Sequence, residues 1–176
     1  MRRRVAALSL MGVVLLGSRC FAAQWTASPT SQTGVYSTWD GPLEIDKCAS
    51  AWLIKRFVDK QAVIKLYPRK TLKMQGQTFD VPMATLKRLP QMSCFESLVR
   101  HFEITEPVVL DIALIVRDIE VNVWAKKRTA ESPGVAAIFS GLDPLFEDKM
   151  KGLEHSFVVL DALYKHIEAR RGTGAK

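Results

Sequence analysis

Two cysteines, Cys48 and Cys94, bring thiol chemistry to the body of the chain. A thiolate is a nucleophile and a reductant, whereas two thiols in an oxidising compartment can pair as a disulfide. Their separation in space does not follow from the sequence, so a disulfide and two buried free thiols remain open alternatives. Cys94 follows Ser93 at an expected helix start, where the helix dipole is expected to lower the pKa of its thiol.

Two arginines, Arg56 and Arg117, lie where apolar helix faces are expected. Arg56 directly precedes Phe57, and Arg117 directly follows Val116. A charge near the core boundary is felt more strongly than in bulk water, and a part-buried Arg117 must therefore be paired. We expect a structural ion pair there. Its possible partners are Asp111, Asp118 and Glu120 of the same helix, or an acid elsewhere.

The motifs of several enzyme classes are absent from the sequence. It has no C-x-x-C pair, no glycine-rich phosphate loop, no flavin or nicotinamide fingerprint and no Ser/His/Asp order. His101, His155 and His166 stand on three separate stretches, without a ligand spacing such as H-x-x-x-H. We therefore expect neither a metal nor a cofactor.

The first expected helix carries several of these side chains. It runs over residues 46–59, with Asp46 as its N-cap. Its apolar residues recur at helical spacing, which predicts that Trp52 is buried. We expect this helix to pack Trp52 against the sheet and to leave Lys55 and Arg56 at its rim.

Four further helices are expected along the chain. The second begins with a capping box, in which Ser93 and Glu96 each satisfy a backbone amide near the other. The third is apolar on nearly every side, which suits a central helix packed all round. The fourth begins with Ser132 as its cap and Pro133 in its first turn, and the fifth is amphipathic. Their expected ranges are 94–102, 108–124, 132–142 and 148–171.

Two short strands are expected at "AVIKLYP" and "QTFDVP", which carry β-branched and aromatic residues between turn formers. The stretch "RKTLKMQG" between them is interpreted as a hairpin-like connection. Residues 23–42 are rich in Ser, Thr, Gly and Pro and are predicted to be an extended lead-in. We expect Trp25, Tyr36 and Trp39 to pin this lead-in to the body.

The composition is that of one globular domain, since 48% of the 176 residues are hydrophobic and 24% are charged. The fold class predicted from these elements is mainly α (α+β), a single compact domain of about five helices with a small two-stranded sheet. The domain is expected over residues 43–170, followed by a disordered tail over residues 171–176.

The first residues have the pattern of an export signal. "MRRRVAALSLMGVVLLGSRCFAAQW" has a basic start, an apolar run and small residues at Ala22 and Ala23. This pattern is typical of a secretory signal peptide, expected here over residues 1–22. The apolar run is shorter than the roughly 18 to 20 residues that span a bilayer, which disfavours an uncleaved anchor. We expect a periplasmic protein that begins at Ala23 or Gln24.

Removal of the signal changes the charge and the cysteine count. Residues 1–22 hold four arginines and no acid, so Lys+Arg falls from 25 to 21 against 18 acids and the net charge falls from +7 to +3. Cys20 leaves with the same segment. A nucleic-acid partner is therefore not expected. Contact with a membrane is expected only through the signal peptide, if it stays uncleaved.

The order of the sequence pieces resembles a known family. "DKCASAWLIKRFVD", a strand, "FDVP", "SCFESL", an apolar helix ending in "IVRD" and "VVLDALY" follow one another from Ile45 to about His166. Together they resemble the chromate-resistance exported protein family, whose module also forms the C-terminal part of ChrB-type proteins. The "SAWLI-R-F" block is the specific part. In ChrB-type proteins a DNA-binding part precedes the module, whereas a signal peptide stands there in this chain, so transcriptional regulation is not carried over.

The resemblance implies a role in bacterial resistance to chromate, a tetrahedral dianion like sulfate. A site for such an anion needs fixed N–H donors and positive charge, from arginines or a helix N-terminus. For the lysines a solvated helix face is the plainer interpretation. The sharpest hypothesis is that Arg56 and Arg117 come together as the positive centre. The candidate ligand-binding residues are Lys47, Lys55, Arg56, Arg88 and Arg117.

This chain also differs from the residue pattern that the family resemblance implies. The resemblance implies histidines near the positions of Arg88 and Arg117 and a cysteine at the position of Ser93. If those family residues hold a metal, this chain has lost the ligands.

Two classes of function follow. The favoured one is a non-catalytic exported accessory protein that binds chromate, a related oxyanion or an envelope protein partner. The alternative is a thiol- or metal-dependent enzyme acting on chromate, in which Cys94 would supply the thiolate, although the sequence offers no evident electron source. A structural module without a ligand is a third interpretation.

Overall fold

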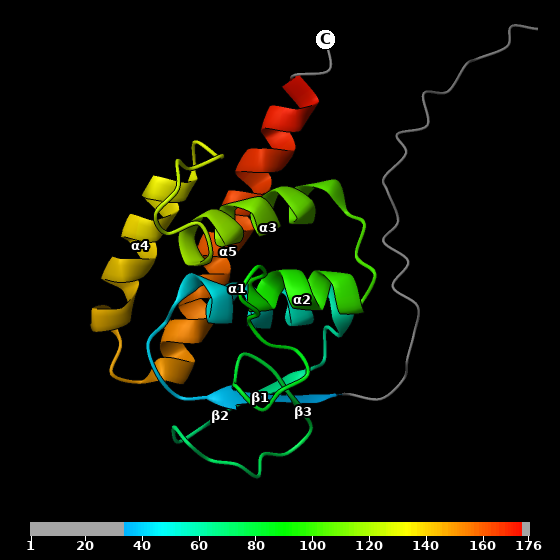
Figure 1. Ribbon diagram of the computed structural model, residues 1–176, viewed down its shortest axis with the longest axis vertical. Coiled ribbons are helices and arrows are strands. Elements are labelled where there is room, and N and C mark those ends of the chain that lie inside the picture. The colour runs from blue at the N-terminus through cyan, green and yellow to red at the C-terminus, as the bar shows by residue number, and fades with distance from the viewer. Residues whose placement is uncertain (1–33, 174–176) are drawn as a thin grey trace, which may run out of the picture.

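A small parallel sheet closes one end of the molecule, and the helices stack above it (Figure 1). The computed structural model describes residues 34–173. Five α-helices confirm the prediction of a mainly α domain, whereas the sheet has three strands instead of the expected two. The predicted signal peptide, Trp25 and residues 174–176 of the expected tail lie outside the described residues.

The sheet has the strand order β2-β1-β3. The central strand β1 (Val35–Trp39) pairs in parallel with β2 (Val63–Tyr67) on one side and with β3 (Gln77–Thr78) on the other. The expected hairpin is therefore wrong, because each outer strand pairs with β1. Residues 35–39, expected as part of the lead-in, are instead the centre of the sheet. Their Ser37 and Thr38 are fully buried, so no alternation of apolar and polar residues marked them as a strand.

The first helix, α1 (Ile45–Leu53), is buried along its whole length and continues into the π-helical turn η1 (Ile54–Val58). Its N-cap is Glu44, so the expected cap Asp46 lies inside the helix. α1 packs against α2 (Cys94–His101), α3 (Pro107–Glu120) and α5 (Lys149–Thr173). It is therefore the central helix of the domain, a place that the sequence had suggested for α3.

The capping box at α2 is confirmed. The hydroxyl of Ser93 accepts from the amide of Glu96 at 3.1 Å, and the Glu96 carboxylate accepts from the amide of Ser93 at 2.9 Å. α3 begins at a proline, but it is not packed all round, because Leu110 and Leu114 are 42% and 43% exposed. One face of α3 is therefore open to solvent.

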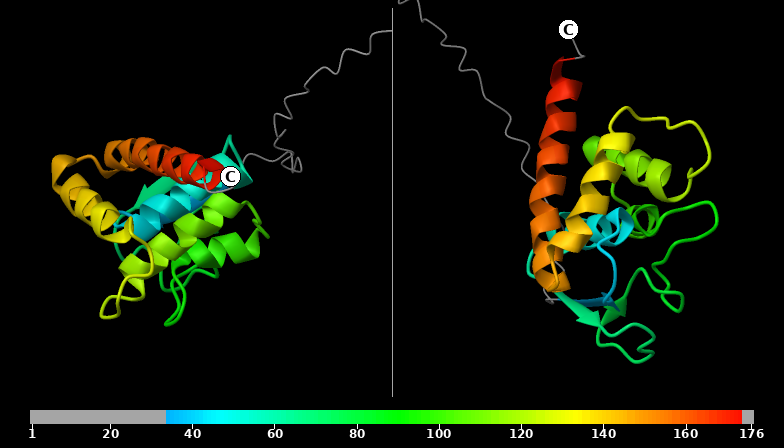
Figure 2. Two further views of the ribbon diagram at one scale, coloured as in Figure 1. Left: turned by 90° about the horizontal axis from the view of Figure 1, so that it is seen from above. Right: turned by 90° about the vertical axis from the view of Figure 1, so that its left-hand side faces the viewer.

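The two C-terminal helices run in opposite directions beside the body of the domain, and the last turns of α5 extend beyond it (Figure 2). α4 (Ser132–Leu145) has Pro133 in its first turn as expected, although its N-cap is Glu131 and not Ser132. α5 continues through Thr173, so residues 171–173 are helical and do not belong to a tail. Leu153, Phe157, Leu160 and Ile167 of the expected stripe are buried.

The burial of Trp52 is confirmed, but its neighbours differ from those expected. Its ring lies 5.1 Å from that of Phe57 and 6.1 Å from that of Tyr164 on α5. Its indole N–H donates to Asp161 at 2.7 Å. Trp52 therefore ties α1 to α5 instead of packing against the sheet.

Candidate functional site

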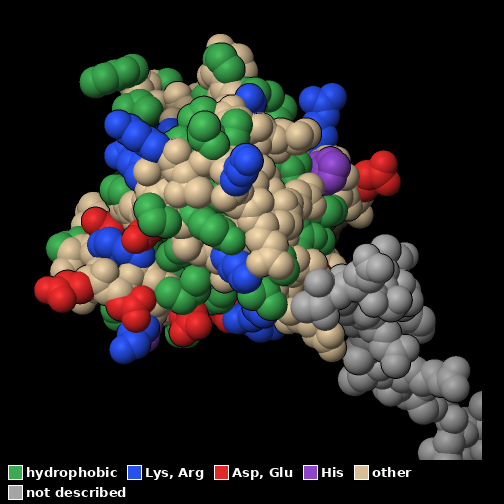
Figure 3. Space-filling view, turned by 90° about the horizontal axis from the view of Figure 1, so that it is seen from below, with side chains coloured by type: hydrophobic (Ala, Val, Ile, Leu, Met, Phe, Trp, Pro, Cys, Tyr) green, Lys and Arg blue, Asp and Glu red, His purple; other side chains and the backbone are tan. Residues whose placement is uncertain are grey.

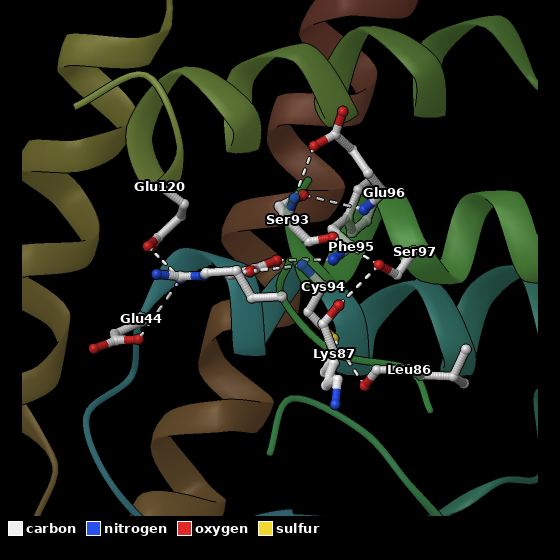
Figure 4. Close-up of polar contacts among 11 residues, drawn as sticks. Glu44, Leu86, Lys87, Ser93, Cys94, Phe95, Glu96, Ser97 and Glu120 are labelled. Carbon is white, nitrogen blue, oxygen red and sulfur yellow. Dashed lines mark hydrogen bonds and ion pairs between the residues drawn. The ribbon is translucent and has the colours of Figure 1, made fainter. Parts of the chain in front are cut away.

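A buried polar cluster surrounds the start of α2 (Figure 4). Its centre is Asp46, whose side chain is fully buried. The two oxygens of Asp46 accept from the amides of Cys94 and Phe95, each at 2.8 Å. Asp46 therefore caps α2, a helix that begins 48 positions later in the chain, and not its own helix.

Arg88 joins Asp46 to two further acids. Its Nε donates to Asp46 at 3.3 Å, and its Nη2 donates to Glu120 and lies 4.0 Å from Glu44. Partial burial alone would lower the pKa of Arg88, but Glu120 and Asp46 together raise it. The guanidinium thus remains charged while 39% of its side chain is exposed to solvent.

Two amides at a helix N-terminus and a guanidinium form the kind of donor set that binds oxyanions in proteins. In this chain the carboxylate of Asp46 occupies that donor set. Burial raises the pKa of Asp46 by more than these bonds from Phe95, Cys94 and Arg88 lower it. An external anion would therefore have to bind beside Asp46, through the exposed part of Arg88.

A cavity of about 500 Å³ has Arg88 in its lining. The Lys87 ammonium sits on its wall and donates to the carbonyl of Pro82 at 2.8 Å. Burial raises the pKa of Asp80 to about 7, and Asp46 adds to this rise while Lys47 and Arg88 oppose it. The lining residues are Asp80, Val81, Pro82, Lys87, Arg88, Leu89 and Pro90.

Both thiols are free and fully buried. Burial raises the pKa of Cys48 to about 12 and that of Cys94 well above its ordinary value. The expected lowering at Cys94 is therefore wrong. Desolvation is the main cause, and the carboxylates of Asp80 and Asp46 add to it because they place negative charge at the helix start.

The two candidate lysines are held by backbone carbonyls. Lys47 is only 7% exposed and donates to Pro42 at 3.1 Å, so the solvated helix face expected for it is wrong. Lys55 donates to Ala62 at 2.9 Å and stays partly exposed. Of the two, only Lys47 lies near the cluster, where it lowers the pKa of Asp80.

The structure gives Arg56 and Arg117 separate acidic partners. Arg56 holds Asp161 of α5 through two hydrogen bonds of 3.0 and 2.7 Å. Arg117 holds Glu96 of α2 at 2.7 Å, so the expected ion pair exists but its acid lies on another helix. The two arginines are therefore not brought together by these contacts as one positive centre.

Arg88, Arg117 and Ser93, the three positions expected from the resemblance to differ from the family, meet at one place. Ser93 and Glu96 form the capping box of α2, Arg117 holds Glu96, and Arg88 holds the Asp46 that caps the same helix. Within residues 34–173 no group of three or more Cys, His, Asp or Glu is arranged to hold a metal. The start of α2 is thus built from hydrogen bonds and ion pairs.

Sequence reasoning missed the acids of this site. Asp80, Glu44 and Glu120 were not singled out as partners of Arg88, although Asp80 stands in the quoted "FDVP" motif. An acid between Phe79 and Val81, both buried, was the available signal.

The amino-acid sequence of this domain is similar to those of known proteins. A family model of the ChrB C-terminal domain matches residues 36–167, which are 132 of the 176 residues. The chain belongs to this family. The ChrB-like family is implicated in chromate resistance, so the resemblance seen in the sequence is confirmed.

Protein ChrB of Cupriavidus metallidurans is 28% identical over 144 residues, which cover 81% of this chain and 44% of that protein. The chain thus spans less than half of that ChrB relative. No solved structure shows a significant match. In the part of this ChrB-family chain that the structure describes, no helix has the length and apolar character needed to cross a bilayer.

Proposed function

We propose that this ChrB-family protein is an exported accessory protein of chromate resistance that binds a tetrahedral oxyanion beside Arg88. The observation that carries the proposal is the cavity of about 500 Å³, whose lining includes both Lys87 and Arg88. Arg88 is fixed by Asp46 and Glu120, and it still has 39% of its side chain exposed. A fixed and accessible guanidinium suits an anion with several acceptor oxygens.

The acids around the cavity set the conditions for binding. Glu44 and Glu120 add negative charge near Arg88, which disfavours a dianion. Asp80 opposes binding only when it is ionised, and its pKa is raised to about 7. A protonated Asp80 can donate a hydrogen bond to an oxyanion, so binding should strengthen as the pH falls from 8 to 6.

Calorimetric titration with chromate and with sulfate at both pH values tests this proposal. Lys87→Gln should weaken binding about fivefold or more while the fold is retained, because Lys87 makes one hydrogen bond to a backbone carbonyl. Arg88→Gln should weaken it further, with circular dichroism as the check on folding. Arg56→Gln, which changes a guanidinium paired with Asp161 on α5, is the matched control. Unchanged affinity in the Lys87 and Arg88 variants would exclude this site.

Export is tested separately. Mass spectrometry of the periplasmic fraction should find a mature chain that begins at Ala23 or Gln24. An intact Met1 in the membrane pellet would contradict it. If the titrations show no anion binding but the chain is exported, the envelope protein partner becomes the better proposal.

A thiol-dependent enzyme has weaker support. Both thiols are fully buried and their pKa values are raised, so almost no thiolate is present at neutral pH. Turnover of chromate with an added reductant that disappears in Cys94→Ser would nevertheless favour the enzyme.

A further inference from the structure

The loop between α3 and α4 presents an aromatic side chain that the fold leaves uncovered. Trp124 is 99% exposed, and the neighbouring Val123 is 52% exposed. Tryptophan carries the largest apolar surface of any side chain, and full exposure of that surface in water is unfavourable. A tryptophan held outward in this way is available for an external contact.

The conformation of this loop is fixed by one buried acid. Asp118 near the end of α3 is fully buried, and its carboxylate accepts from the amides of Arg128 and Thr129 at 2.6 and 2.9 Å. The amide group of Asn122 adds a third bond at 3.1 Å. Lys127 donates to the carbonyls of Asp118 and Asn122 and so crosses the base of the loop. The exposure of Trp124 is therefore built into the fold.

In the loop between α3 and α4, the charged side chains of residues 121–130 are all basic. Residues 121–130 contain Lys126, Lys127 and Arg128 and no acid. Lys126 and Arg128 are exposed beside Trp124. The first acid after the loop is Glu131, and it pairs with Arg170 of α5. The surface around the tryptophan is therefore basic.

The loop projects at the end of the molecule that lies away from the sheet (Figures 1 and 2). The C-terminal end of α5 lies on the same side, where Arg171 binds Asp111 of α3. Trp124 can consequently approach a flat surface without obstruction by the sheet.

We propose that this loop docks reversibly on an anionic phospholipid surface, with Trp124 in the headgroup region and Lys126 and Arg128 over the lipid phosphates. Tryptophan is enriched at membrane interfaces, because its ring is apolar and its indole N–H still reaches water or lipid oxygens. Basic residues add attraction to anionic lipids, and one tryptophan with a few charges gives weak binding. This surface is distinct from the cavity at Arg88, and the inference does not rest on oxyanion binding.

Sedimentation with vesicles tests the inference, using the protein as the cell produces it. Vesicles of equal phosphatidylglycerol and phosphatidylcholine are compared with pure phosphatidylcholine at 50 mM and 500 mM salt. The protein should bind the anionic vesicles in low salt, and high salt should release most of it. All variants share one N-terminus, so differences between them report the loop.

Trp124→Ala should weaken vesicle binding about fivefold or more, since its exposure means that the fold does not depend on it. The double change Lys126→Gln with Arg128→Gln should weaken it about tenfold. Leu72→Ala is the matched control, because Leu72 is 76% exposed in the β2–β3 connection at the opposite end, which faces the viewer in Figure 3. Equal binding by wild type and Trp124→Ala would overturn the inference. So would failure of the wild type to bind anionic vesicles, which would leave a protein as the partner of the loop.

Discussion

Neither Asp46 nor Asp118 has exposed surface, and each carboxylate accepts hydrogen bonds from two backbone amides. Their pKa values nevertheless shift in opposite directions. Burial raises the pKa of Asp46 by more than its hydrogen bonds lower it. Burial would also raise the pKa of Asp118, but there the bonds from Asn122, Thr129 and Arg128 together lower it. The same residue type thus caps a helix in one region and closes a loop in the other, and the loop carboxylate is the more acidic of the two.

Depth and charge together explain the difference. Asp118 is covered by one loop near the surface, so it loses less solvation than Asp46, which lies between α1 and α2. Asp46 lies near Asp80 and Glu120, whose pKa values are also raised, so negative charge is crowded around one guanidinium. The bonds to the side-chain carboxylate of Asp118 come only from neutral donors, and they include hydroxyl groups and an amide side chain. A buried carboxylate is therefore easily ionised where donors are many and acids are few.

The largest expected effect is that of Asp46→Ala. The change removes the cap of α2 and leaves Arg88 without its buried partner, so the free energy of unfolding should fall by about 3 to 5 kcal/mol. Urea denaturation at pH 7 measures it. Asp46→Asn keeps one acceptor oxygen and should cost less. A loss below about 1 kcal/mol for the alanine variant would show that Asp46 does not organise the cluster.

Asp118→Ala should cost about 2 to 3 kcal/mol, because several donors of the loop lose one charged acceptor. The loop should also open, so trypsin should cut at Lys126 or Arg128 faster than in the wild type. Asp111→Ala on the same helix is the control, since its carboxylate binds only the exposed side of Arg171. Equal cleavage rates in both variants would contradict the role of Asp118.

Asp80→Asn should stabilise the protein by about 2 kcal/mol at pH 8, since one pKa unit corresponds to about 1.4 kcal/mol and partial exposure reduces the effect. The folded pKa is raised to about 7, so the folded state holds a proton that the unfolded state has lost. The contribution of Asp80 to the stability of the wild type therefore falls as the pH rises from about 4 to 7. Asp80→Asn should not show this decrease.

Backbone geometry adds a second contribution at Asp80, whose φ is 52°, because asparagine tolerates this region well. Glu103 has the same φ of 52°, so Glu103→Asn gives an upper limit for the backbone part, because glutamate tolerates this region less well than aspartate. Thermal unfolding between pH 4 and 8 separates the two contributions. A wild-type slope that persists in Asp80→Asn would assign the titration to another acid.

The smallest expected effect is that of Thr129→Val, which keeps the shape but removes the hydroxyl that donates to Asp118 at 3.2 Å and also hydrogen-bonds the hydroxyl of Ser132. Stability should fall by about 1 kcal/mol. A carboxylate with a lowered pKa stabilises the fold above its unfolded pKa, and this gain is lost as the pH falls through the folded value. The acid limb of the unfolding curve should therefore move to higher pH in the variant, and an unmoved limb would contradict the comparison.

Local signals were readable from the sequence, and non-local ones were not. The capping box of Ser93 and Glu96 lies within four residues, so its pattern predicted the start of α2 correctly. The amphipathic stripe of α5 was equally visible. Asp46 had the residue type of a cap, but its helix begins 48 positions away, and nothing near Asp46 in the sequence indicates that distance.

The central strand β1 was not predicted, for a related reason. Its buried Ser37 and Thr38 resemble loop residues, because their burial depends on partners that come later in the chain. Ser37 donates to the carbonyl of Gln75 at 2.5 Å, which a sequence pattern does not reveal. Lys47 was read as solvated because lysine is rarely buried. The surroundings of Arg88 were therefore predicted only in part, because its acidic partners were not foreseen.

The central place of α1 also has a consequence for synthesis on the ribosome. α1 is translated early, but its neighbour α5 is translated last, and the bond from Trp52 to Asp161 spans 109 positions. A nascent chain that has not yet reached Asp161 carries an uncovered apolar helix, which exposes it to aggregation and to chaperones. The last helix must therefore be complete before α1 can be covered on its α5 side.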